Sequence, residues 1–289
     1  MTTIGAMIRR EIQPELVADH ARELDGAFDV LWVVEDLPWA GGVSQLTAVL
    51  DAADTALVGH GIAPTPFRNA VALAMEWATI SRQHPGRLVA GLGHGVQEWM
   101  RSIGAAVDSP LTLLEEQLVA IRTLLAGESL SMDGRYVQAD GITLKFPPTV
   151  PVPVHAGVTG PKSLVLSGRA ADGTILGEGS SPDVVMRARR LIDEGRASVG
   201  RVDDHHLVVF VAVHVGSRSD LRPGFSESLW SSVHTDPDRV VEDLAAIGAA
   251  GADSVVVVPI GTNPMADLAS VGHLVVPALR SRIQPPPTP

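Results

Sequence analysis

Residues 87–95 read Arg-Leu-Val-Ala-Gly-Leu-Gly-His-Gly, so a run of apolar residues ends in three alternating glycines. The apolar run predicts a buried strand, because a strand that is covered on both faces is hydrophobic throughout instead of alternating. The glycines lack a Cβ, which lets a ligand or a neighbouring chain approach closely, and they also suit a tight turn. The stretch therefore indicates either a strand that opens onto a binding site or a simple turn.

The same order of strand and then helix recurs along the whole chain. Eight apolar runs are each followed by a segment of helical period. The predicted strands are Thr3–Ile8, Val30–Glu35, Ala56–Ile62, Leu88–Leu92, Val152–Gly157, Gly173–Gly177, Leu207–Val215 and Ser254–Ile260. The predicted helices begin near Pro14, Gln45, Asn69, Pro110, Pro161, Pro182, Pro237 and Pro264. Proline suits the first turn of a helix, where its missing N–H costs no hydrogen bond.

Eight repeats favour a closed (β/α)8 TIM barrel over an open doubly wound sheet. An open sheet usually has fewer strands and needs a phosphate-binding loop directly after the first one. Residues 7–10, which occupy that position, read Met-Ile-Arg-Arg and form no such loop. We expect a single α/β domain over residues 1–289, with an irregular flap inserted at about 125–151 and a mobile proline-rich tail at 284–289.

Composition and charge restrict the partners of the chain. Of its 289 residues 45% are hydrophobic, which suffices for one large core, and the formal net charge is −11. An acidic chain without clustered lysine and arginine is not expected to bind nucleic acid. No apolar run is long enough to span a bilayer, and the N-terminus lacks the order of a signal peptide. We therefore expect a cytoplasmic protein that acts on a small molecule, without disulfides or thiolate chemistry because cysteine is absent.

In a TIM barrel the chemistry lies at the carboxyl ends of the strands. Glu35 ends the second predicted strand and Asp36 follows it, and His94 lies between glycines after the fourth. Asp36 would exchange a proton if burial raised its pKa, or else it caps a loop or lies on the surface. Trp39 is either a wall of a substrate site or a core residue. These side chains are the polar and aromatic candidates for the site.

The turn after the fifth predicted strand is a candidate anion site. Gly160 stands directly before a helix that begins at Pro161, and the free N–H groups of a helix N-terminus attract phosphate. Lys162 adds a positive charge, although an ordinary helix start would look the same. His60, His94 and His155 lie near strand ends, but their spacing does not match a metal site, and we interpret His60 and His94 as polar lining of a pocket.

Four blocks of the chain resemble the luciferase-like monooxygenase family, which includes flavin-dependent enzymes and F420-dependent reductases and dehydrogenases. The blocks are residues 61–62 with 69–74, residues 86–95, residues 152–157 with 160–162, and residues 168–173. The resemblance implies F420, or alternatively FMN, at the mouth of a (β/α)8 barrel, and a non-prolyl cis peptide at Gly61–Ile62. The cofactor residues expected on this basis are His60, Gly61, Ile62, Gly93, Gly95, Val158, Thr159, Gly160, Pro161, Lys162, Gly177 and Glu178.

Two departures from the family pattern narrow the expected reaction. Sugar dehydrogenases of the family are expected to carry Asp-His after the second strand and a glutamate after the glycines of the fourth. The corresponding positions here are Glu35-Asp36 and Val96, and the following Gln97 and Glu98 begin a helix. The histidine base for alcohol oxidation is therefore missing, and sugar oxidation is not expected.

We expect hydride transfer from reduced F420 to a small organic substrate, with Asp36, Glu35 and His94 as the catalytic candidates. The alternatives are an FMN-dependent monooxygenase and a non-catalytic protein that binds flavin or F420, since a fold alone does not guarantee activity. The resemblance also makes a homodimer an expectation, although no patch in the sequence identifies its interface.

Overall fold

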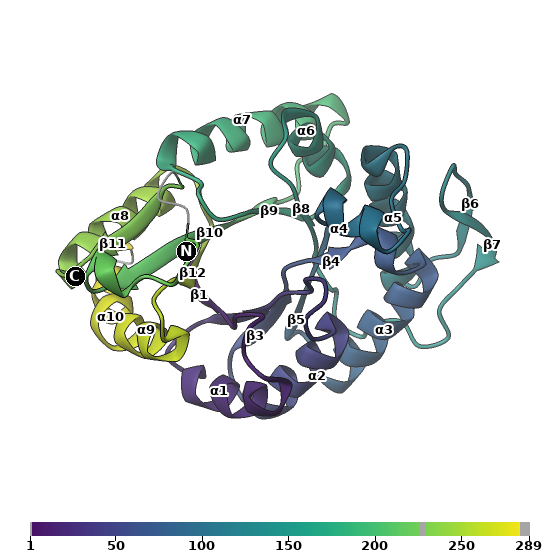
Figure 1. Ribbon diagram of the computed structural model, residues 1–289. Coiled ribbons are helices and arrows are strands. Elements are labelled where there is room, and N and C mark those ends of the chain that lie inside the picture. The colour runs from purple at the N-terminus through teal and green to yellow at the C-terminus, as the bar shows by residue number, and fades with distance from the viewer. Residues whose placement is uncertain (1, 226–228, 284–289) are drawn as a thin grey trace, which may run out of the picture.

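A computed structural model describes residues 2–225 and 229–283 and contains a closed barrel of parallel strands (Figure 1). The barrel strands, in order around the barrel, are β1 (Thr3–Met7), β2 (Val30–Val33), β3 (Leu57–His60), β5 (Leu88–Gly93), β8 (Val154–Gly157), β9 (Gly173–Leu176), β10 (His206–Val215) and β12 (Ser254–Pro259). Pairing of β12 with β1 closes the ring. The predicted TIM barrel is confirmed.

Helices surround the barrel on its outside (Figure 1). They are α1 (Val17–Leu24), α2 (Gly42–Ala52), α3 (Ala70–Gln83), α4 (Gln97–Ser102), α5 (Pro110–Leu125), α6 (Pro161–Ala170), α7 (Pro182–Ser198), α8 (Pro237–Ala249), α9 (Pro264–Ser270) and α10 (Val276–Ile283). Five of the predicted helix starts coincide with a proline at the first helical position, at residues 110, 161, 182, 237 and 264. The first predicted helix instead begins at Val17, after a 3-10 turn at Pro14–Leu16.

Three features were not predicted from the sequence. Two short strands, β4 (Ala63–Pro64) and β11 (Ser231–His234), pair with β5 and β10. The expected irregular flap contains an antiparallel hairpin of β6 (Leu130–Asp133) and β7 (Gln138–Ile142), which projects from the barrel (Figure 1). Its turn is held by Glu116 of α5, whose carboxylate accepts N–H bonds from residues 135–137. That contact joins distant residues, so no local pattern reveals it.

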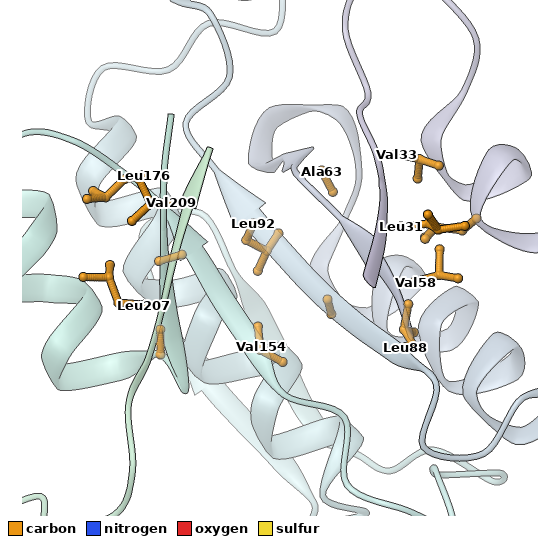
Figure 2. Close-up of a cluster of buried hydrophobic side chains, with 14 of the residues drawn as sticks. Leu31, Val33, Val58, Ala63, Leu88, Leu92, Val154, Leu176, Leu207 and Val209 are labelled. Carbon is orange, nitrogen blue, oxygen red and sulfur yellow. The ribbon is translucent and has the colours of Figure 1, made fainter. Parts of the chain in front are cut away.

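The barrel strands bury both of their faces. Leu31 of β2 packs in an outer layer with helix residues such as Trp77, and Figure 2 shows the strand side of this layer. Trp32, the next residue, belongs to the separate inner cluster, where its ring meets Phe210 edge-on at 5.4 Å between centroids. Successive side chains point to opposite faces of a strand, so both faces require apolar residues. This explains the continuous apolar runs in the sequence.

The glycines of residues 87–95 serve two different purposes. A Cβ on Gly91 would lie 2.2 Å from the carbonyl oxygen of His60, so Gly91 allows β3 and β5 to approach each other. Gly95 has a φ of +67°, which an L side chain rarely adopts, and it turns the chain into α4. The strand therefore ends in a true turn, but this turn also faces the cavity described below.

Within residues 2–225 and 229–283, no helix is long and apolar enough to cross a membrane. The predicted tail at 284–289 lies outside the described residues. The organisation of residues 1–289 as one domain stays a prediction.

Candidate active site

A cavity of about 340 Å³ lies at the carboxyl ends of the barrel strands. Most of the residues that were predicted for the site lie in its wall. The lining residues are Glu35, Asp36, Gly61, Ile62, Pro64, His94, Gly95, Val96, Trp99, Gly157, Val158, Thr159, Gly160, Ile175, Gly177 and Phe210. The peptide bond between Gly61 and Ile62 is cis, as the family resemblance implied.

Glu35 is a buried carboxylate whose hydrogen-bonding capacity is used within the protein. It is 6% exposed, and its two oxygens accept bonds from the Arg68 guanidinium, each at 2.6 Å. Its Oε1 also accepts the backbone N–H of Gly42 at 3.0 Å. Burial alone would raise the pKa of Glu35, but the hydrogen bonds and charge of Arg68 hold it below its ordinary value. This environment suits a positioning role better than proton transfer.

Asp36 lies nearer the solvent and forms an ion pair with Arg10. The Arg10 Nη1 donates to Asp36 Oδ2 at 2.6 Å, and the two side chains are 32% and 29% exposed. Arg10 also lies over the ring of Trp99 on α4, with 5.8 Å between its Cζ and the ring centroid. Arg10 thus connects the two lining residues Asp36 and Trp99.

His94 is half-buried, and its two ring nitrogens bridge neighbouring helices. Nδ1 lies 3.2 Å from the carbonyl oxygen of Pro110 on α5, and Nε2 lies 3.1 Å from Ser163 Oγ on α6. Because a carbonyl oxygen only accepts, Nδ1 carries the proton in this arrangement, and Nε2 accepts from the serine hydroxyl. Burial lowers the pKa of His94, and the bond to Pro110 only partly opposes this. A neutral imidazole in the cavity wall is the result.

The turn from β8 into α6 forms one end of the cavity. Gly160 is the N-cap of α6 and offers no side chain to the first turn, so the N–H groups there can meet an anion. A Cβ added at Gly160 would approach only Ser163 Oγ, at 3.9 Å, and one added at Gly177 would meet no atom within 4 Å. Side chains at these glycines would take up cavity space, so the cavity fits a flat ring with an attached phosphate.

Six predicted residues do not line the cavity. They are Trp39, His60, Gly93, Pro161, Lys162 and Glu178. His60 is fully buried behind the wall, with its ring against Trp77 at 6.0 Å between centroids, and burial lowers its pKa to about 4 against the opposing charge of Glu35. Pro161 and Lys162 line a separate depression that includes Leu111.

The other three predicted residues, Gly93, Trp39 and Glu178, also lie outside the lining of the cavity. Gly93 packs against β8, since a Cβ there would lie 2.9 Å from the Gly157 carbonyl oxygen. Trp39 is 48% exposed, and Trp99 of α4 provides the tryptophan in the cavity wall instead. Glu178 follows the lining residue Gly177, and burial raises the pKa of its carboxyl while Arg222 partly offsets this.

Sequence reasoning missed Trp99, Phe210 and the two arginines that pair with the cavity carboxylates. Arg10 and Arg68 are separated from their partners by 26 and 33 residues, so no local spacing links them. Gln97 and Glu98 begin α4, and neither is a lining residue of the cavity. Among the residues that the structure describes, no group of three or more histidine, aspartate or glutamate side chains could hold a metal ion.

The sequence profile of the luciferase-like monooxygenases matches residues 1–254. The chain belongs to the luciferase-like monooxygenase family. It is 30% identical over 174 residues to a 5,10-methylenetetrahydromethanopterin reductase of Methanolobus tindarius, covering 60% of this chain and 53% of the relative. It is 30% identical over 214 residues to an F420-dependent glucose-6-phosphate dehydrogenase of Nakamurella multipartita, covering 70% of this chain and 60% of the relative. The chain thus spans little more than half the length of these curated relatives.

Solved structures of F420-dependent enzymes share the fold. An F420-dependent secondary alcohol dehydrogenase in complex with an F420–acetone adduct superposes with a TM-score of 0.85 at 17% identity, covering 97% of this chain and all 100% of that one. The F420-dependent tetrahydromethanopterin reductase of Methanopyrus kandleri superposes with a TM-score of 0.82 at 20% identity, covering 96% and 99%. At these identities the likeness supports the barrel fold alone.

Proposed function

We propose that this luciferase-like protein is an oxidoreductase in which reduced F420 provides a hydride for a small organic substrate. One observation carries the proposal: an apolar cavity at the barrel mouth continues to the uncapped N-terminus of α6. A flat ring and its phosphate would find complementary surfaces in this single site. The F420 dependence named for several relatives supports this cofactor.

Different residues of the chain would bind the ring and the phosphate of the cofactor. Ile62 and Val158 would pack against the ring, while Thr159 and Gly160 would hold the phosphate. When bound, reduced F420 supplies the hydride, and the protein supplies position and electrostatics. Apolar side chains of the wall would exclude water around a bound ring, and Asp36 is the lining carboxylate with access to solvent for exchange of a proton. Glu35 and His94 keep the wall in place through the contacts described above.

Titration of the purified protein with F420 and with FMN tests the cofactor. We expect F420 to bind at least about tenfold more tightly than FMN, a difference of about 1.4 kcal/mol. Tight FMN binding without F420 affinity would overturn the proposal in favour of the monooxygenase alternative. Oxidation of bound F420H2 by a panel of enones, imines and aldehydes then tests the activity. Bound cofactor that never changes redox state would favour a non-catalytic binding protein.

We also propose a cytoplasmic homodimer. Met75 of α3 and Val119 of α5 are exposed apolar residues on two helices that pack together, and Phe146 from the insertion is 71% exposed. Exposed apolar residues on neighbouring helices suit association with a second copy. Light scattering on the purified protein measures the mass in solution, and a mass of one chain at micromolar concentration would contradict the dimer. Cell fractionation tests the location.

A further inference from the structure

Every charged side chain in the cavity wall has a partner within the protein. Glu35 is held by Arg68 and by the Gly42 N–H, and Asp36 is held by Arg10 at 2.6 Å. Among the residues that the structure describes, the wall therefore presents no unpaired carboxylate to a cationic ligand. An ion that enters such a wall loses its hydration without gaining a counter-ion.

The wall also lacks a cation for an anionic substrate. Within residues 2–225 and 229–283, no lysine or arginine is a lining residue of the cavity. Arg10 only borders it, in contact with the lining residues Asp36 and Trp99, and its charge is already paired with Asp36. Residues 226–228 and the other undescribed positions contain neither lysine nor arginine in their sequence. Lys162 lines the separate depression with Leu111, and Arg222 acts electrostatically on Glu178. Among the described residues, the anion-binding feature at the cavity is the α6 N-terminus, and the proposed function assigns it to the cofactor phosphate.

The apolar side chains of the wall include Ile62, Val96, Trp99, Ile175 and Phe210. Such side chains favour the burial of hydrocarbon, at roughly 25 cal/mol per Å² of apolar surface. The Asp36–Arg10 pair interrupts this surface beside Trp99. A paired guanidinium and carboxylate can form hydrogen bonds with a neutral polar atom, and the pair still has no net charge.

We propose that the substrate is an uncharged ketone or enone with an apolar body that packs against Trp99, and with its oxygen towards the Asp36–Arg10 pair. The proposal rests on the function proposed above. In the reaction the electrophilic carbon gains the hydride, the π electrons pass to the acceptor end of the substrate, and that end takes one proton. Reduced F420 would supply the hydride and would lose one proton to solvent as it becomes oxidised, and the proton that the substrate takes would come from solvent, so that protons and electrons balance.

Three ketones of similar size and different charge test this proposal: cyclohexanone, 4-oxocyclohexanecarboxylate and protonated 4-piperidone. F420 binding to the whole protein is measured first, by fluorescence. Each ketone is then titrated into the F420-loaded protein near pH 7. We expect cyclohexanone to bind at least about tenfold more tightly than either charged ketone. Equal binding of the three, preference for a charged ketone, or binding of none overturns the inference. Failure of F420 itself to bind would instead overturn the proposed function.

The variant Arg10→Gln tests the pairing directly. Removal of the guanidinium leaves the Asp36 carboxylate unpaired, so we expect affinity for 4-piperidone to rise at least about fivefold relative to cyclohexanone. The double variant Arg10→Gln/Asp36→Asn should lose this gain. Arg239→Gln, which removes an exposed ion pair with Glu242 far along the chain, is the matched control. An unchanged order of affinities in Arg10→Gln, with the variant folded, would contradict the role of the pair.

Discussion

Glu35 shows how a carboxylate can lie in a cavity wall and still be committed to the fold. Arg68 is only 23% exposed at its side chain, and both Glu35 oxygens accept from it. The sequence placed Glu35 correctly at a strand end, but it could not reveal that Arg68 lies opposite. Its assignment as a catalytic candidate therefore depended on position alone, and the contacts indicate a positioning residue.

Glu35→Gln tests this role. The substitution leaves Arg68 with only the more exposed Glu76, at 3.3 Å, as a charge partner. We expect the free energy of unfolding to fall by about 3 kcal/mol, because breaking a buried pair costs more than losing an exposed one. Glu35→Gln/Arg68→Met should recover part of the loss. Glu242→Gln, in the exposed pair with Arg239, should change stability by less than about 1 kcal/mol. Urea denaturation measures all three, and full stability of Glu35→Gln with lost activity would restore the catalytic interpretation.

At the scale of elements, the turn between β5 and α4 determines where Val96 and Trp99 stand. Gly95→Ala places an L residue at a φ of +67° and sets its Cβ 3.0 Å from the Pro64 Cβ. We expect a loss of about 1–2 kcal/mol in stability. Gly200→Ala is the matched control, because Gly200 has a φ of +69° and an added Cβ there meets no atom within 4 Å.

Gly95→Ala and Gly200→Ala should differ in their effect on substrate binding. Only Gly95→Ala displaces residues of the cavity wall, so we expect a severalfold rise in KM for the substrate in this variant and none in Gly200→Ala. Steady-state kinetics of F420H2 oxidation measures KM. Equal KM values in both variants would show that the turn has no influence on the substrate site.

The start of α6 offers a second test at this scale. Gly160 has φ −74° and ψ 148°, which any residue can adopt, and the helix lacks a side-chain cap. Gly160→Asp and Gly160→Asn should both add a few tenths of a kcal/mol to stability by capping α6. The aspartate also places a negative charge where the phosphate is proposed to bind, so we expect it to weaken F420 binding at least about tenfold more than the asparagine does.

A phosphate-free deazaflavin provides the control for this pair of variants. Its affinity should be similar in Gly160→Asp and Gly160→Asn, because it carries no charge at that end. Fluorescence titration with both ligands gives the comparison. If the aspartate and asparagine variants bind F420 equally well, the phosphate lies elsewhere.

For the whole molecule, the repeated apolar runs and helix-starting prolines were sufficient to predict the barrel. Each run is buried on both faces, and a strand buried in this way can be recognised from its own sequence because it is continuously apolar. The hairpin of β6 and β7 and the pairs Arg10–Asp36 and Arg68–Glu35 depend instead on contacts between distant residues. The ends of the predicted strands therefore indicated where the site lies. The pairing of its carboxylates with arginines could be found only from the three-dimensional structure.

The buried histidines give the whole barrel a dependence on pH. Burial lowers the pKa of His60 to about 4, with the Glu35 charge opposing this. It lowers the pKa of His155 to about 3, and the charges of His206 and His205 add to the effect. An unfolded histidine has a pKa of about 6.5. Between about pH 4 and 6.5 the unfolded chain therefore binds one more proton per buried histidine than the folded chain.

Stability must consequently fall as the pH falls through this window, since extra proton binding favours the unfolded state. The slope is at most about 1.4 kcal/mol per pH unit for each histidine. Carboxylates with depressed pKa values, such as Asp25 at about 2, add to the loss only at lower pH. Urea denaturation at pH 7, 6 and 5 measures the slope. His155→Gln removes one titrating group and should make the slope shallower.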